Sequence, residues 1–154
     1  MTSSRLIFGR YDYAAFTSFI CYAVCSIIVP VALVALAKDL GFPLDKGGMG
    51  AGGVLHFGRS AAIVVSMLFC GFVAGRIGLR KSLGLGVLLM GSGLFLCAFS
   101  QWYWALLALL LVAGLGEGVI EGLATPFVQE LHKQEPGRYI NFAHSFWSVG
   151  VTLT

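Results

Sequence analysis

Four ionisable side chains lie inside long apolar stretches of the sequence: Arg59, Glu117, Glu121 and His144. A charged side chain at the centre of a bilayer costs about 2.5 to 3.5 kcal/mol on insertion scales, so such groups normally face a bundle interior or a water-filled cavity. Carboxylates and imidazoles in that setting can bind and release protons or contact a polar solute. We therefore expect any chemistry of this chain to take place among these residues.

The two glutamates share one helix face with a row of glycines. Glu117 and Glu121 are four residues apart, as are Gly114, Gly118 and Gly122. Residues at this spacing stack along a helix, and the glutamates lie about one side-chain width from the glycine row. Because rows of small residues mark where membrane helices approach closely, the pattern predicts that both carboxylates point into the bundle.

A second polar face follows farther along the chain. Asn141, His144, Ser145, Ser148 and Thr152 are spaced as one face of a helix whose other residues are mostly apolar. The spacing predicts that this face looks inward or toward water.

Glu121 and His144 lie at a similar predicted depth, roughly 7 to 8 Å from the same end of neighbouring helices, so they can meet. One interpretation is structural: Glu121 pairs with His144, or caps a turn at Thr125-Pro126, and so holds two helices together. The favoured interpretation is functional, with Glu121 as a protonatable carboxylate at a substrate cavity.

Two further groups of residues leave alternatives open. Ser18, Tyr22 and Ser26 are spaced four apart and either line a cavity or bond and pack within their own helix. Arg59, with His56 one turn before it, is a solute contact, a partner of Glu117 or an arginine that extends toward the membrane surface. The predicted depth of Arg59 is roughly 10 Å nearer the outside than that of Glu117, which argues against a direct pair.

The composition indicates the elements that position these residues. Of the 154 residues, 58% are hydrophobic and 11% are charged, against about 25% charged in an average soluble domain. Because a bilayer core needs about 20 apolar residues in a helix, we predict an all-α, polytopic membrane helix bundle with four complete spans and a shortened fifth. These spans form a single, incomplete domain over 1–154, at about 13–37, 52–75, 82–100, 102–126 and 139–154.

The basic residues of the predicted loops set the orientation. Seven of them fall on one side of the predicted topology: Arg5, Arg10, Arg76, Arg80, Lys81, Lys133 and Arg138. Positive charge collects on the cytoplasmic side, which predicts a cytoplasmic N-terminus in a multi-pass protein of the cell membrane. The first apolar run is too long for a cleaved signal peptide, whose apolar region has about 7 to 15 residues.

Other classes of protein fit the sequence poorly. The four cysteines, Cys21, Cys25, Cys70 and Cys97, all fall in predicted spans, which indicates packing residues rather than a disulfide framework or a zinc site. The predicted loops are too short to build an enzyme site. We expect no enzymatic activity, no metal or cofactor and no nucleic-acid partner.

The loop between the second and third predicted spans reads GFVAGRIGLRK. This string resembles the signature of the major facilitator superfamily, Gly-x-x-x-Asp-Arg-x-Gly-x-Arg-Lys, with a glycine, Gly75, at the position of the aspartate. The residues that match are Gly71, Arg76, Gly78, Arg80 and Lys81. The resemblance implies that this loop takes part in the conformational change of a transporter.

The fourth and fifth predicted spans are similar to those of the fucose and glucose to proton symporter branch of that superfamily. The matching pattern runs from Glu121 to Val128 and continues at Arg138, Asn141 and Phe146. In that branch the glutamate is implicated in proton coupling and the polar residues of the fifth helix in sugar contact. The resemblance implies these roles for Glu121 and for Asn141 with His144.

We therefore interpret the chain as the N-terminal part of a twelve-span secondary transporter that carries a small polar solute, a sugar, together with a proton. Glu121 and Glu117 are the predicted proton-coupling residues. The predicted cavity residues are Ser18, Tyr22, Asn141, His144, Ser145 and Ser148. The expected partners are the solute, the proton, the bilayer and the C-terminal half of the transporter, since alternating access needs both halves. The alternative is a multi-span structural or assembly protein without transport, whose glycines bind partner helices.

Overall fold

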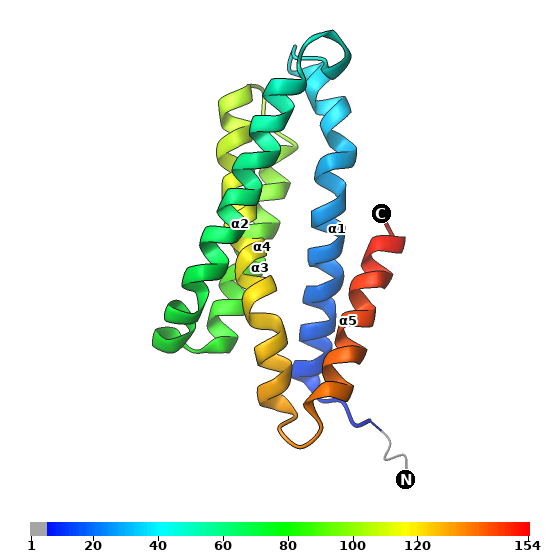
Figure 1. Ribbon diagram of the computed structural model, residues 1–154, viewed down its shortest axis with the longest axis vertical. Helices are drawn as coiled ribbons and strands as arrows, with labels where there is room; N and C mark the ends of the chain where they lie inside the picture. Colours follow the sequence, from blue (N-terminus) through cyan, green and yellow to red (C-terminus); the bar gives the residue numbers. More distant parts are fainter. Residues whose placement is uncertain (1–5) are drawn as a thin grey trace.

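The computed structural model describes residues 6–154, apart from the side chain of residue 44, and Arg5 of the predicted basic loop lies outside them. Every regular element in the described part is helical, which confirms the predicted all-α class. The elements in chain order are α1 (Arg10–Asp39), the short 3-10 helix η1 (Leu44–Lys46), α2 (Met49–Ile77), α3 (Leu79–Cys97), α4 (Tyr103–Leu131) and α5 (Pro136–Thr152). Figure 1 shows α2, α3 and α4 on one side of the bundle and α1 with α5 on the other.

Four of the helices are long and apolar enough to cross a membrane: α1, α2, α3 and α4, with 30, 29, 19 and 29 residues. The fifth helix has 17 residues. This agrees with the prediction of four complete spans and a shortened fifth. The helices differ from the predicted spans at their ends: α1 and α2 extend beyond the predicted span at both ends, α4 extends to Leu131, and α3 lies three residues earlier than predicted.

The expected turn at Thr125-Pro126 is absent, and this prediction is wrong. Helix α4 continues through Pro126 and ends only at Leu131, and α1 likewise contains Pro30. Membrane helices tolerate proline because neighbouring groups satisfy the backbone that the ring frees. Thr125 is thereby held on the same continuous helix as Glu117 and Glu121.

The glycine row of α4 packs directly against α2. A Cβ atom on Gly118 would lie 2.2 Å from the carbonyl oxygen of Ile63, and one on Gly114 would lie 2.6 Å from that of Arg59. On the next face, Gly116 approaches α3 so closely that a Cβ atom would lie 2.3 Å from the amide nitrogen of Met90. The close approach predicted for the row of Gly114, Gly118 and Gly122 is therefore present, and together with the contact at Gly116 it fixes α4 between α2 and α3.

Aromatic rings hold α5 against α1. Phe16 and Phe146 stack with ring centroids 4.6 Å apart and nearly parallel planes. One turn beyond, Gly150 allows close approach, since a Cβ atom there would lie 2.6 Å from the carbonyl oxygen of Ile20. On another face of α5, His144 is turned toward Thr125 of α4.

Candidate functional site

Arg59 and Glu117 form a buried ion pair between α2 and α4. The Arg59 guanidinium donates from Nε to Glu117 Oε1 at 2.9 Å and from Nη2 to Oε2 at 2.6 Å. Arg59 is 3% exposed and Glu117 is fully buried. Such two-pronged contacts between arginine and a carboxylate are short, strong and geometrically specific.

Helix α1 completes the environment of this pair. Arg59 Nη2 donates to the backbone carbonyl of Cys25 at 3.3 Å, and Ser26 Oγ donates to Glu117 Oε2 at 3.4 Å. The pair therefore connects three helices. Glu117 points into the bundle, as its position beside the glycine row predicts, whereas Glu121, for which the same was predicted, is exposed.

The prediction that Arg59 and Glu117 lie at depths too different for a direct pair is wrong. Arg59 lies about ten residues into α2 and Glu117 about fourteen into α4, an offset along the bundle of about 6 Å. The long arginine side chain spans this offset because close packing at Gly114 brings the two backbones together. Arg59 is therefore a partner of Glu117 and does not extend to the membrane surface. His56, one turn before it on α2, is exposed.

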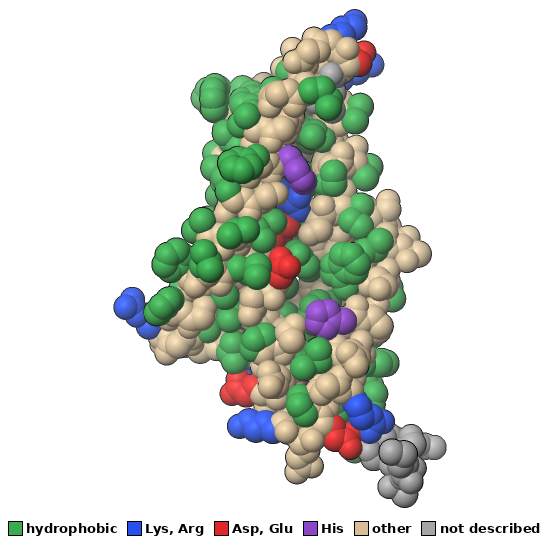
Figure 2. Space-filling model, viewed as in Figure 1, with side chains coloured by type: hydrophobic (Ala, Val, Ile, Leu, Met, Phe, Trp, Pro, Cys, Tyr) green, Lys and Arg blue, Asp and Glu red, His purple; other side chains and the backbone are tan. Residues whose placement is uncertain are grey.

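Glu121 has a different environment one turn along α4. Its side chain is exposed and its Oε2 accepts a hydrogen bond from the Tyr22 hydroxyl of α1 at 2.9 Å. Within the described residues it forms no ion pair. Figure 2 shows basic, acidic and histidine side chains following one another down the middle of the face between α2 and α1.

His144 contacts α4 at Thr125 and not at Glu121. His144 Nε2 lies 3.1 Å from Thr125 Oγ1, one helical turn from Glu121. The imidazole also contacts Phe19 of α1, with ring centroids 4.9 Å apart. The structure thus brings Tyr22, Glu121, Thr125 and His144 together on one face, and we call these four residues the open polar cluster.

The other predicted cavity residues divide into two groups. Asn141, Ser145 and Ser148 are exposed on α5, although the Ser145 hydroxyl donates to the backbone carbonyl of Phe142. Ser18 is buried and donates to the carbonyl of Ala15 in its own helix. Ser18 thus bonds within its own helix and also lines a cavity between α1 and α3, whereas Tyr22 reaches the open polar cluster.

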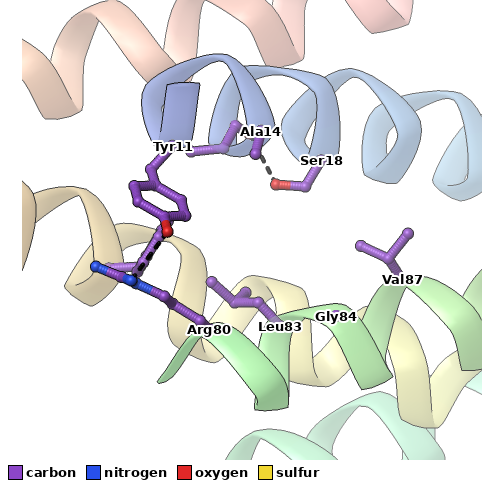
Figure 3. Close-up of a pocket in the computed structure, with 9 residues that line it drawn as sticks. Tyr11, Ala14, Ser18, Arg80, Leu83, Gly84 and Val87 are labelled. Atoms are coloured by element: carbon purple, nitrogen blue, oxygen red, sulfur yellow. Dashed lines mark hydrogen bonds between the residues drawn. The ribbon is translucent and has the colours of Figure 1, made fainter. Parts of the chain in front are cut away.

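The loop with the transporter signature makes a tight turn between α2 and α3. Gly78 has a φ of +89°, which favours glycine, and Gly71, Arg76 and Lys81 are exposed. Arg80 reaches across to α1, where its Nη1 donates to the Tyr11 hydroxyl at 3.0 Å and its guanidinium lies 4.0 Å from the ring centroid. Figure 3 shows this contact at the edge of a cavity of 260 Å³ between α1 and α3.

A polar contact that the sequence reasoning missed joins the ends of α1 and α4. Asp12 Oδ1 lies 2.6 Å from His132 Nε2, and the Asp12 side chain also accepts from the amide of Gly9 at 2.8 Å. The imidazole stacks on Tyr139 at 3.5 Å between centroids. In the sequence, the acidic Asp12 near the start of the first apolar run indicates a helix N-terminus with a cap near Gly9. Nothing in the sequence spacing pointed to His132, which lies 120 residues away.

The described residues hold no cluster of three or more His, Cys, Asp and Glu side chains that could bind a metal ion. The four cysteines are free; Cys70 and Cys97 are buried, and Cys21 and Cys25 are half-buried. Burial or half-burial without a disulfide partner is typical of cysteines that pack between helices.

Comparison with known proteins agrees with this arrangement of helices. The model of the Major Facilitator Superfamily matches residues 14–154. The synaptic vesicle glycoproteins 2C of mouse and human are each 26% identical to the chain over 147 residues, which cover 92% of this chain and 20% of theirs. The chain thus spans about a fifth of the length of these relatives, and no solved structure matches it. With a family match over nearly its whole length, and with helices that form the N-terminal part of that fold, the chain belongs to the Major Facilitator Superfamily.

Proposed function

We propose that this chain forms the N-terminal part of a secondary transporter that carries a small polar solute together with a proton. The observation that carries the proposal is the open polar cluster: an exposed carboxylate, Glu121, bonded to Tyr22 and placed beside Thr125 and His144 on one face of a membrane bundle. Ionisable groups at membrane depth mark substrate and proton pathways in transporters. The family of the chain supports membrane transport in general.

Glu121 is the proposed proton-coupling residue. Its carboxylate is exposed, accepts a hydrogen bond from a neutral hydroxyl and forms no ion pair among the described residues. Such a carboxylate can accept a proton without leaving a cation unpaired. When the cavity is open to the acidic side, Glu121 binds a proton, and when solute hydroxyls rearrange the cluster it releases that proton to the other side.

The proposed solute is a sugar. Asn141, His144, Ser145 and Ser148 are exposed along one face of α5 and offer amide, imidazole and hydroxyl groups that suit a polyhydroxylated solute. The similarity of the fourth and fifth helices to the fucose and glucose to proton symporter branch supports this choice. Alternating access would require a second helix bundle to pack on the open face and enclose the solute.

The proposed location is the cell membrane, with the N-terminus in the cytoplasm. The excess of basic residues at one end of the bundle supports this orientation. Single cysteines replacing exposed Lys81 and Lys46, in a chain without its four native cysteines, provide the test. An impermeant thiol reagent added to intact cells should label the cysteine at position 46 and spare that at 81, and the reverse labelling would overturn the orientation.

The alternative, a structural or assembly protein whose glycine rows bind partner helices, is less well supported. The glycine row of α4 already packs on α2 within this chain. This row is therefore occupied, and a partner helix would have to bind at glycines with open space, such as Gly71 and Gly75 of α2.

The test of coupling is the Glu121→Gln variant of the full-length protein in vesicles. Glutamine mimics the protonated state permanently, so accumulation driven by a pH gradient should be abolished while solute exchange across the vesicle membrane persists. A Glu121→Gln protein that still concentrates solute would exclude the coupling role and leave the structural alternative for this residue.

A further inference from the structure

The buried pair of Arg59 and Glu117 suggests a role for Arg59 that the proposed function does not contain. We propose that Arg59 is a positioning residue that withholds Glu117 from proton exchange, so that Glu121 is the single exchanging carboxylate of this helix bundle. The inference rests on the proposed proton coupling and specifies which of two neighbouring acids performs it.

The geometry supports a permanent pair. Both oxygens of Glu117 accept hydrogen bonds from Arg59, at 2.9 and 2.6 Å, and the carboxylate is fully buried. Arginine stays protonated in proteins. A proton on Glu117 would therefore leave a buried guanidinium without its counterion, which is more costly than keeping the pair.

The groups around the pair do not supply an alternative counterion. From α1 the Ser26 hydroxyl donates to Glu117, the Cys25 carbonyl accepts from Arg59, and the Tyr22 hydroxyl bonds to Glu121. From α4 the nearest acid is Glu121, one turn away. From α3 the thiol of Cys97 lies near Arg59. Helix α5 contributes His144, which is bonded to Thr125 and not to Glu117. Glu117 is thus the carboxylate that neutralises Arg59.

This arrangement has a consequence for transport. If both glutamates exchanged protons, each transport cycle could move two protons through this bundle. With Glu117 held by Arg59, the bundle moves one. Neutralising Arg59 removes the reason for Glu117 to stay ionised, and the number of exchanged protons should rise.

The test measures protons moved per solute in vesicles containing the full-length protein. Arg59→Gln should raise the number of protons per solute by one relative to wild type. The double variant Arg59→Gln with Glu117→Gln should return to the wild-type number, because it contains no second carboxylate. A purely structural role for the pair would change transport rate or protein yield but leave the proton number unchanged in both variants.

The double variant keeps the inference falsifiable if Arg59→Gln alone does not fold. A double variant that moves fewer protons than wild type shows that Glu117 exchanges protons and overturns the inference. A double variant that moves the wild-type number shows that Glu117 is not an exchanging carboxylate, as the inference requires, and the higher number in Arg59→Gln separates the inference from a purely structural role, whose unchanged number in Arg59→Gln would overturn it. Failure of the proposed function has a different signature: a wild-type protein with no proton movement would overturn coupling itself, and this inference with it.

Discussion

Glu117 and Glu121 are one helical turn apart on α4, yet their surroundings are opposite. Glu117 is fully buried and held by two hydrogen bonds from Arg59, whereas Glu121 is exposed and bonded to the Tyr22 hydroxyl. Helix α2 packs on α4 at both levels, at Gly118 and at Gly122, so the difference lies in the side chains that reach each carboxylate. Arg59 and Ser26 enclose Glu117, whereas the Tyr22 hydroxyl bonds to Glu121. Identical residue types at adjacent turns are therefore suited to different tasks: one joins helices and the other is available to proton and solute.

The largest effect on stability should come from removing one partner of the buried ion pair. Glu117→Ala leaves the Arg59 guanidinium buried without a counterion, and we expect a loss of about 3 to 5 kcal/mol in the free energy of unfolding. Thermal unfolding of the purified protein in detergent measures it. The control is the double variant Arg59→Met with Glu117→Leu, which removes both charges and should be close to wild type in stability. Equal losses of unfolding free energy in both proteins would show that the unpaired charge of Arg59 is not the cause of the destabilisation.

A smaller loss should follow from opening the contact that separates the two environments. Gly118→Leu places a branched side chain where even a Cβ atom would lie 2.2 Å from the Ile63 carbonyl oxygen. We expect a loss of about 1 to 3 kcal/mol, together with weaker burial of Glu117.

Gly91 of α3 provides the matched control for that variant, because a Cβ atom there has no neighbour within 4 Å. Gly91→Leu should unfold at the wild-type temperature. If Gly118→Leu is as stable as Gly91→Leu, the close approach of α2 and α4 is incorrect.

The smallest effect on stability is expected at the open polar cluster. Tyr22→Phe removes the hydrogen bond to Glu121 and should cost about 0.5 to 1.5 kcal/mol in unfolding free energy. Tyr103→Phe, which loses a bond to the Ala51 carbonyl, is the control and should cost about the same. Solute affinity should fall only in Tyr22→Phe. Equal affinities in the two variants would remove Tyr22 from the solute site.

The sequence predicts the helices better than it predicts their side-chain partners. Long apolar runs identify the membrane helices because bilayer thickness sets their length, and the glycine spacing identifies the face of α4 that packs on α2. The continuation of α4 through Pro126 escaped prediction because a membrane environment tolerates proline within a helix.

The partners of the polar residues depend on geometry that residue counting does not contain. Depth estimates along separate helices omitted the reach of the Arg59 side chain and so excluded its true partner. The same estimates brought Glu121 and His144 to one level, but His144 lies against Thr125, one turn nearer the end of α4 than Glu121. Helix packing also decides which hydroxyl groups reach the open polar cluster. The Tyr22 hydroxyl reaches it, whereas the Ser18 hydroxyl bonds within its own helix.

The most direct test of the contrast between the two glutamates is reaction with dicyclohexylcarbodiimide, an apolar reagent that modifies protonated carboxyl groups. The membrane-embedded protein would be treated at a series of pH values, and the modified positions would be identified by peptide mass spectrometry. We predict modification of Glu121 that increases as the pH falls and is reduced by bound solute, with Glu117 unmodified. Modification of Glu117 as fast as that of Glu121 would contradict the assignment of one held and one exchanging carboxylate.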